Sequence, residues 1–450
     1  MNANELTQNA SHHPVIPSKT FSLYDGIAVV VGIVIGAGIF QFPTLIAMNV
    51  VSGSWMVFTW LLGGLISLVG VLCYAELACA YPDAGGDYHF LYRGLSARIA
   101  FVFAWTRMVV IQPGSIAMMA FVAGQELSRF FPLGSFSEAL WAALVVLVLS
   151  GINIAGVHTS NTAQKTLTGA ILLGLLGIVV LGIFVAATPA SATPTQSANH
   201  QSVSGFGRAM VFVLLTFGGW NEVAYISSEM RAFERNIVRS LLVGIAVVTL
   251  LYVLVNVALY HALGLGGMRS FSVYHDLIRH TLGERFEMVL SVLILLAALS
   301  TANVTMATGA RSNYAFGRDF RLLPFLGRWD GVRGVPMAAL GFQTWITLLL
   351  VVLGATYKKG LTSMVDYTSP AFWFFFLLTG VSLIALRWRD PNRLRPFRTP
   401  LYPLTPVVFV LFCAFMLHSS ISYAGRGAGW SVAVMAVGFL AMLVETRQKT

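Results

Sequence analysis

The sequence predicts an all-α integral membrane protein of about 12 transmembrane helices, organised as a five-plus-five inverted repeat followed by two additional helices. The first supporting observation is composition: 57% of the 450 residues are hydrophobic and 10% are charged, more apolar than a soluble domain requires. The second is that the apolar segments have the length that crosses a bilayer. The third is that glycines interrupt two of these segments, about half the chain apart, a pattern typical of transporter substrate sites.

Twelve apolar segments are the predicted spans. They cover residues 25–48, 54–80, 99–125, 139–156, 166–187, 209–231, 237–262, 285–312, 336–355, 366–386, 401–422 and 428–444. The polar residues 1–20 predict a cytoplasmic N-terminal tail. The first span is longer than a signal-peptide core and lacks a small-residue cleavage site, so we expect no cleavage.

The net charge of +10 is explained by topology rather than by nucleic-acid binding. With the N-terminus inside, 19 of the 28 Lys and Arg residues lie on the cytoplasmic side and eight on the other side, which is the positive-inside pattern. We therefore expect a multi-pass protein of the plasma membrane, or of the inner membrane in a Gram-negative cell, with both termini cytoplasmic. The three cysteines lie within predicted spans and lack metal-ligand spacing, so we expect no metal and no cofactor.

The chain from 21 to 450 is expected to form a single transmembrane domain. A polar segment at 188–208 separates repeat one, at about 21–187, from repeat two, at about 205–390, and helices 11 and 12 occupy about 400–445. Because the two repeats begin on opposite sides of the membrane, the repeat would be inverted. Two loops predict short helices, an interfacial one at 88–95 on the cytoplasmic side and an outer one within 268–284.

The first interruption, Gly36-Ala37-Gly38, lies at the centre of the span at 25–48. Backbone groups freed by unwinding inside a bilayer are tolerated only where they line a cavity. The N–H groups of these three residues, at the positive end of the following half-helix, suit the carboxylate of an amino acid. The carbonyls of Ile33 and Val34 suit its ammonium. The alternative interpretation is close helix packing, because Gly32 and Gly36 form a small-xxx-small pair.

The second interruption, Phe217-Gly218-Gly219-Trp220-Asn221, lies at the centre of the span at 209–231. We expect the Phe217 carbonyl to contact the ammonium, Trp220 to close over the substrate, and Asn221 to bridge substrate and unwound backbone. The alternative is ordinary aromatic packing and a satisfied helix-end amide. Glu222 follows at a depth where charge is costly, so it is a candidate site for a proton or a cation, with a structural hydrogen bond as the alternative.

Polar residues in the third span are candidates for a side-chain pocket. Gln112 and Ser115 flank Pro113, and the alternative is that one of them satisfies the backbone carbonyl that Pro113 frees. Arg107, in the cytoplasmic third of this span, is expected to snorkel or to pair inward rather than to contact substrate.

The eighth span carries a similar group of polar side chains. Ser300, Thr301, Asn303 and Thr305 offer oxygens to a cation or to water, Asn303 also being a candidate for the side-chain pocket. Interhelical hydrogen bonding is the alternative.

Several motifs together resemble one family. Ile35-Gly36-Ala37-Gly38-Ile39-Phe40, Cys73-Tyr74-Ala75-Glu76-Leu77 and Gly85-Gly86-Asp87-Tyr88 resemble the opening of permeases of the amino acid–polyamine–organocation superfamily. The third span around Gln112-Pro113-Gly114-Ser115 and the segment Phe217–Asn221, closing at Ser228-Glu229-Met230, are similar to its L-type amino-acid transporter branch, as is the spacing from Asn303 to Arg311. The resemblance implies a LeuT-like fold with helices 1 and 6 broken.

Two departures from the family pattern bear on mechanism. Members often carry a lysine inside the fifth span, in place of a sodium ion, where this chain aligns Ala170 or Ile171, with Lys165 nearer the cytoplasmic end. Glu222 stands where L-type transporters usually have an uncharged residue. These departures leave proton-coupled symport and exchange both open.

The expected function is secondary active transport of amino acids by alternating access, with neutral amino acids favoured by an aromatic, mostly uncharged site. A polyamine or cationic amino-acid substrate is the alternative, supported by Glu222. A membrane enzyme or channel is the alternative of a different class, and it is disfavoured because the spans lack clustered acids and histidines and repeated polar rings. The expected partners are an amino-acid substrate, the lipid bilayer and a coupling proton, with no obligatory protein partner.

Overall fold

The computed structural model describes residues 27, 30–32, 34–83, 85–156, 161–184, 203–222, 234–270, 272–356 and 360–447. In this part of the chain, ten helices are long and apolar enough to cross a membrane, and two shorter apolar helices accompany them. The expected class, an all-α multi-pass membrane protein, is confirmed. The expected N-terminal tail and Ile33 lie outside the described residues.

The helices follow the predicted spans closely. They are α3 (Gly38–Ala47), α4 (Gly53–Ala80), α5 (Asp87–Gly94), α6 (Ala97–Thr106), α7 (Gln112–Phe130), α8 (Ser137–Ile154), α9 (Asn161–Phe184), α10 (Val203–Thr216), α11 (Glu234–Met268), α12 (Val273–Leu282), α13 (Glu284–Asp319), α14 (Met337–Thr356), α15 (Gly360–Arg389), α16 (Leu404–Ala424) and α17 (Arg426–Arg447). A π-helical turn, Arg107–Ile111, joins α6 to α7, and a 3₁₀ turn, Pro324–Gly327, lies between α13 and α14.

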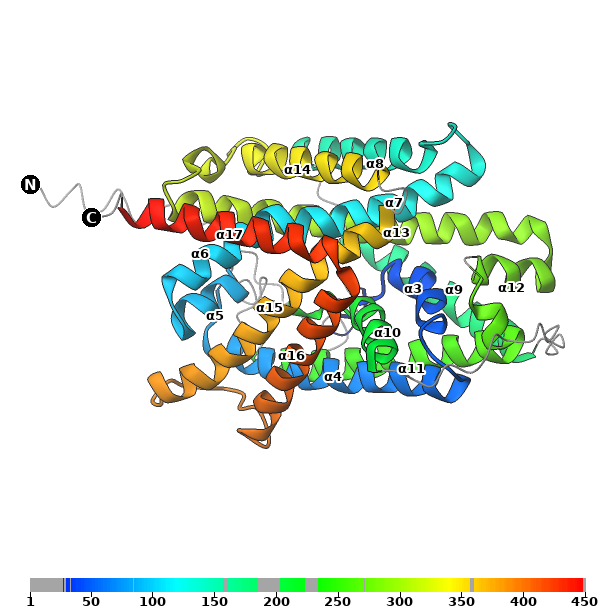
Figure 1. Ribbon diagram of the computed structural model, residues 1–450, viewed down its shortest axis with the longest axis horizontal. Coiled ribbons are helices and arrows are strands. Elements are labelled where there is room, and N and C mark those ends of the chain that lie inside the picture. Colours follow the sequence, from blue (N-terminus) through cyan, green and yellow to red (C-terminus); the bar gives the residue numbers. More distant parts are fainter. Residues whose placement is uncertain are drawn as a thin grey trace, which may run out of the picture.

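The short helices α3 and α10 lie in the middle of the molecule, surrounded by long helices (Figure 1). They pack against each other; α4 also packs against α10, and α11 packs against α3 and α4. On the other side, α7 packs along α13. This arrangement places the ends of two short helices in the interior, where most other spans cross without a break.

Two short helices outside the bilayer-length set match the sequence predictions. The stretch predicted as an interfacial helix is α5, and the predicted outer helix is α12. They lie at opposite ends of the molecule (Figure 1). Tyr274 of α12 donates a hydrogen bond to the Ile39 carbonyl at 2.6 Å, so this helix contacts the beginning of α3 directly.

Local sequence explains where several helices begin. Ser52 accepts a hydrogen bond from the Trp55 N–H, and Ser96 accepts one from the Ile99 N–H. Each serine thereby satisfies a backbone donor that has no partner within its helix, α4 and α6 respectively.

One end of the α4–α15 pair is held by a buried acid. Glu76 of α4 is 1% exposed and accepts hydrogen bonds from Arg387 of α15, the shorter at 2.5 Å. Arg395 lies 3.3 Å from the same carboxylate, and the backbone N–H of Thr399 donates to it at 2.7 Å. A single carboxylate therefore ties α4 to α15 and to the segment that follows α15.

Candidate functional site

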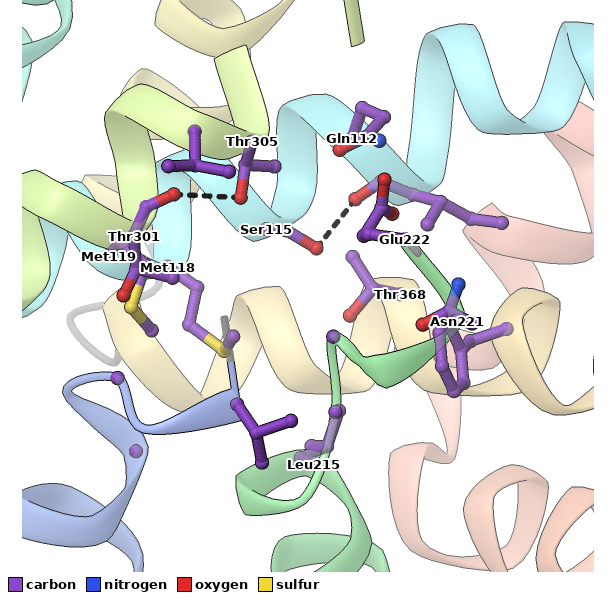
Figure 2. A pocket seen from close by; sticks show the side chains of 18 of the residues that line it. Gln112, Ser115, Met118, Met119, Leu215, Asn221, Glu222, Thr301, Thr305 and Thr368 are labelled. Atoms are coloured by element: carbon purple, nitrogen blue, oxygen red, sulfur yellow. Dashed lines mark hydrogen bonds between the residues drawn. The ribbon is translucent and has the colours of Figure 1, made fainter. Parts of the chain in front are cut away.

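A cavity of about 160 Å³ lies where the two interrupted helices meet. At roughly 10–15 Å³ for each water molecule, it has room for a small molecule with about ten heavy atoms. Figure 2 shows side chains from α7, α13, α15 and the segment after α10 gathered around it. Most of the residues predicted to form the site line this cavity: Val34, Gly36, Ala37, Gly38, Gln112, Ser115, Gly218, Asn221, Glu222, Ser300 and Thr301.

The first break leaves the N-terminus of α3 open to the cavity. Residues 35–37 are not helical, and α3 begins at Gly38. Ala37 is the N-cap and makes no side-chain cap, so the first N–H groups of α3 receive no capping acceptor from it. An anionic group in the cavity can accept from these donors and also gains from the helix dipole.

Gly36 also lies in close contact with a neighbouring helix, which was the alternative interpretation for this glycine. A Cβ atom at this position would lie 2.6 Å from Thr301 Oγ1, closer than two such atoms can approach. The residue therefore lines the cavity and at the same time allows α13 to pack against the first break.

The second break begins where α10 ends at Thr216. The chain turns at residues 217–219 and forms a short 3₁₀ turn at 220–222. Gly219 has φ +104°, a conformation that residues with a Cβ atom rarely adopt. This turn directs Asn221 and Glu222 into the cavity wall.

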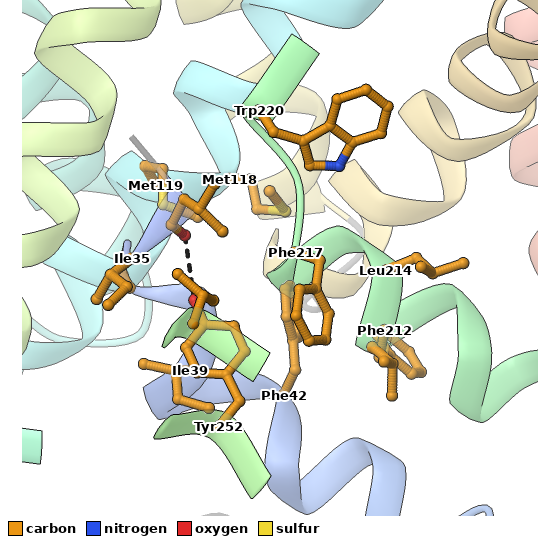
Figure 3. Close-up of a cluster of buried hydrophobic side chains, with 14 of the residues drawn as sticks. Ile35, Ile39, Phe42, Met118, Met119, Phe212, Leu214, Phe217, Trp220 and Tyr252 are labelled. Atoms are coloured by element: carbon orange, nitrogen blue, oxygen red, sulfur yellow. Dashed lines mark hydrogen bonds between the residues drawn. The ribbon is translucent and has the colours of Figure 1, made fainter. Parts of the chain in front are cut away.

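Tyr252 of α11 links the two breaks, a role that was not among the sequence predictions. Its hydroxyl lies 3.1 Å from the Val34 carbonyl and 3.3 Å from the Thr216 carbonyl. The side chain is fully buried and packs on Trp60. It also packs on Phe217 (Figure 3). A tyrosine within an apolar span gives no signal in the sequence for this role, because both partners are distant backbone groups.

The third span contains a π-helical turn just before the cavity. Gln112 N–H bonds the Arg107 carbonyl, five residues earlier, and such turns occur frequently at functional sites. Pro113 has no N–H to donate to Val109, and the Tyr367 hydroxyl donates to that carbonyl at 3.3 Å. The Val109 carbonyl therefore accepts its hydrogen bond from Tyr367, and not from the side chain of Gln112 or Ser115.

Gln112 and Ser115 face the cavity in different ways. Ser115 Oγ donates to the Ile111 carbonyl at 2.8 Å, so its hydroxyl presents acceptor capacity to the cavity. Gln112 is 2% exposed, and its Nε2 has no hydrogen-bond partner among the described residues. A buried amide donor without a partner is costly, and a ligand acceptor would satisfy it.

Arg107 pairs inward, one of the two predicted arrangements, and its partner is Glu222. Arg107 Nη2 lies 3.1 and 3.0 Å from the two Glu222 carboxylate oxygens. Its Nε donates to Ser312 Oγ of α13 at 3.3 Å. The guanidinium therefore joins the π-helical turn, the segment after α10 and α13 at one end of the cavity.

The α13 wall of the cavity is a row of hydroxyl side chains. Thr301, Thr305 and Thr308 line the cavity, at the spacing that places residues on one helix face. Thr301 Oγ1 donates to the Ala297 carbonyl at 3.0 Å, and Thr305 Oγ1 donates to the Thr301 carbonyl at 2.8 Å. The thioethers of Met118 and Met119 from α7 complete this part of the wall.

Three of the predicted site side chains lie away from this cavity. Phe217 is fully buried against Trp60 and Tyr252. The Trp220 ring stacks edge-on against Tyr74 at 5.0 Å. Asn303 accepts a hydrogen bond from Asn153 of α8 at 2.7 Å. The structure thus gives these side chains packing and interhelical contacts, which were the alternatives stated for them.

In the fifth span, a threonine lies against Gly32, four residues before Gly36. A Cβ atom at Gly32 would lie 2.8 Å from Thr168 Oγ1, so Thr168 of α9 faces this glycine. Ile171 is buried, and nothing is described of the Lys165 side chain. The aligned positions Ala170 and Ile171 offer no charge at this place.

Comparison with known proteins gives consistent matches over nearly the whole chain. Residues 21–443 match the model of a family described as amino acid permease. The mouse b(0,+)-type amino acid transporter 1 is 26% identical over 413 residues, which is 90% of this chain and 82% of the relative. The rabbit large neutral amino acids transporter small subunit 2 is 28% identical over 433 residues, or 93% of this chain and 79% of the relative. The mouse Asc-type amino acid transporter 1 is 27% identical over 434 residues, with 93% and 80% covered.

Proposed function

We propose a function for this chain on the premise that it belongs to the amino acid permease family: it transports amino acids by alternating access, with neutral amino acids as its main substrates. The observation that carries the proposal is the cavity at the broken ends of α3 and α10. Transporters bind substrate at such paired breaks, near the bilayer midplane. Its family and relatives are permeases and transporters, so the chain is a transporter and not an enzyme.

Backbone groups at the two breaks suit the common part of every amino acid. The N–H groups from Gly36 to Gly38 would hold the carboxylate at the N-terminus of α3. The Val34 carbonyl, which accepts one hydrogen bond from Tyr252, keeps a second lone pair for the ammonium. Carbonyls at the end of α10, including that of Phe217, complete the ammonium site in this proposal.

The cavity wall favours neutral side chains. Met118, Met119 and the phenyl rings of Phe372 and Phe376 line it together with threonines, an environment suited to apolar and small polar groups. Glu222 was the residue that supported a cationic substrate, and in this structure it is paired with Arg107. The name of one similar protein refers to large neutral amino acids, which agrees with a neutral substrate for this chain.

Exchange is the coupling mode that this geometry supports best. Proton uptake by Glu222 would remove the negative charge that its ion pair with Arg107 depends on. A proton cycle at Glu222 therefore requires the pair to open during transport, whereas exchange of one amino acid for another requires no such step. Glu222 remains the residue at which proton coupling is to be tested.

The protein is a multi-pass membrane protein, and we infer that it resides in the plasma membrane with both termini cytoplasmic. The distribution of 19 Lys and Arg residues inside and eight outside supports this orientation. The inverted repeat, in which the two interrupted spans are equivalent, is part of the same proposal.

Counterflow in proteoliposomes tests the proposal. Preloaded unlabelled amino acid should accelerate uptake of labelled substrate, which neither a channel nor a membrane enzyme would produce. We expect neutral amino acids to compete, and lysine, arginine and putrescine to compete weakly. Gly38→Leu should abolish counterflow with normal membrane insertion, because a Cβ atom there would already lie 3.3 Å from the Phe42 ring and 3.5 Å from Thr216 Cα, so a larger side chain would push the two breaks apart. Counterflow by polyamines alone would overturn the neutral class, and its absence with every amino acid and every polyamine would overturn transport.

A further inference from the structure

The ion pair between Arg107 and Glu222 is built into the wall of the cavity, at the end bordered by the π-helical turn. Arg107 is 3% exposed, and both residues line the cavity. The guanidinium uses Nη2 for the Glu222 carboxylate and Nε for Ser312. The Arg107 charge, buried to this degree, is stable only while it is paired, and Glu222, whose side chain is 20% exposed, is its carboxylate partner.

The ionisable groups around the cavity are few. Among the described lining residues, Arg107 is the cation, and Asp87 and Glu222 are the acids. Asp87 accepts hydrogen bonds from Tyr74 at 2.5 Å and from Thr379 at 3.1 Å. It is also the first residue of α5, where the helix dipole stabilises a negative charge. Asp87 therefore has compensation of its own, while Glu222 takes its compensating charge from Arg107.

We propose that Arg107 determines which charge class of substrate the cavity accepts. Paired with Glu222, it makes this end of the cavity neutral and admits zwitterions with uncharged side chains. A cationic side chain entering the cavity would meet the guanidinium and could reach Glu222 only by displacing it. Without Arg107, Glu222 would be a partly exposed acid in the cavity wall without its countercharge, and a lysine-like or polyamine-like ammonium would supply one. This inference rests on the proposed amino-acid site and names its charge selector.

The proposal differs from a purely structural role, in which Arg107 only fastens α13 to its neighbours. A structural staple predicts that its loss weakens binding of every substrate together. A charge selector predicts a change in the ratio between two substrate classes, whatever happens to overall affinity. The ratio is therefore the decisive quantity.

Binding of leucine, lysine, arginine and putrescine to purified protein tests the proposal, with Arg107→Gln as the principal variant. The ratio of cationic to neutral affinity should rise by at least about tenfold, which is about 1.4 kcal/mol. Arg107→Gln/Glu222→Gln removes both charges and should return the ratio to its original value. Arg107→Lys keeps the charge and should keep the neutral preference. Arg279→Gln, which removes the arginine of an exposed pair with Glu287, is the matched control.

Three outcomes separate the alternatives. An unchanged ratio in a folded Arg107→Gln protein overturns the charge-selector role. If that variant does not fold, the double variant and Arg107→Lys decide. A preference for cationic substrates in either of these two proteins overturns the proposal. Failure of the original protein to bind any amino acid would instead overturn the proposed function, so the two failures are distinguishable.

Discussion

At the scale of single residues, the site depends on two glycines that lack a Cβ atom and on one tyrosine hydroxyl. Gly36 has no space for a Cβ atom because Thr301 fills it. Gly219 adopts a positive φ at the turn after α10. Tyr252 places one hydroxyl between two carbonyls from different breaks. Each of these positions can be tested by a small substitution.

Gly36→Ala should destabilise the protein by about 1–3 kcal/mol, the usual cost of overpacking, and should weaken substrate binding. Its methyl group would overlap Thr301 Oγ1. Gly36→Ala/Thr301→Ala removes the overlapping atom and should recover most of the thermal stability in detergent. Gly341→Ala in α14, where a Cβ atom meets nothing within 4 Å, is the control and should be neutral or slightly stabilising. A fully stable single variant would contradict the packing argument.

Tyr252→Phe should lower stability by about 1–3 kcal/mol, because a buried carbonyl loses its donor. Thermal unfolding with and without substrate measures the effect. Tyr260→Phe on the same helix, at a residue that is 41% exposed, should change stability by less than about 0.5 kcal/mol. Equal effects of the two changes would show that the shared hydroxyl contributes nothing specific.

At the scale of helices, hydrogen bonds and ion pairs of polar side chains connect the ends of neighbouring helices. Glu76 connects α4 to α15 through Arg387 and to the following segment through Arg395 and Thr399. At the other end of the molecule, Tyr274 of α12 bonds the beginning of α3. These contacts set how freely the helices can move relative to one another.

Glu76→Gln should destabilise the α4–α15 contact by about 1–3 kcal/mol, because Arg387 and Arg395, whose side chains are 17% and 6% exposed, lose their carboxylate partner. The amide keeps the size of the side chain, so packing is preserved and the loss reports charge. Thermal unfolding and protease sensitivity near α15 measure it. Glu287→Gln, which breaks an exposed pair with Arg279, should change little. A Glu76→Gln protein as stable as that control would refute the role of the buried pair.

At the scale of the whole molecule, hydropathy and glycine placement predicted most of the fold. The predicted spans agree with the helices, and the glycines at 36 and 218 mark real breaks. The polar lining of α13 was also foreseen, because Ser300 and Thr301 stand out in an apolar span. Such signals are local: they depend on one segment and its period.

The parts that the sequence did not predict are contacts between distant segments. Arg107 and Glu222 are 115 residues apart, and the sequence around each residue does not indicate the other as its partner. Asn303 was expected near substrate, yet the rotation of α13 directs it toward Asn153. Trp220 was expected over the substrate, yet it packs against Tyr74. Polarity shows that a residue needs a partner, while only packing decides which one.

The orientation in the membrane is a prediction for the molecule as a whole. The segment at 318–333 and the C-terminal end should face the cytoplasm, because arginines concentrate there. Single cysteines added at these places should react with membrane-impermeant reagents only in opened cells. The natural cysteines, at 73, 79 and 413, are buried and should contribute little background. Labelling of the added cysteines in intact cells would contradict the orientation.

The methionine pair in the cavity wall has a chemical consequence of its own. Met118 and Met119 line the cavity and are at most 8% exposed, so an oxidant must enter the cavity to reach them. Conversion to the sulfoxide turns a flexible apolar side chain into a polar one. A bound substrate should shield both thioethers from dilute peroxide, and mass spectrometry of the α7 peptide would then record occupancy as protection from oxidation. Peroxide damage would accordingly inactivate the empty transporter faster than the occupied one.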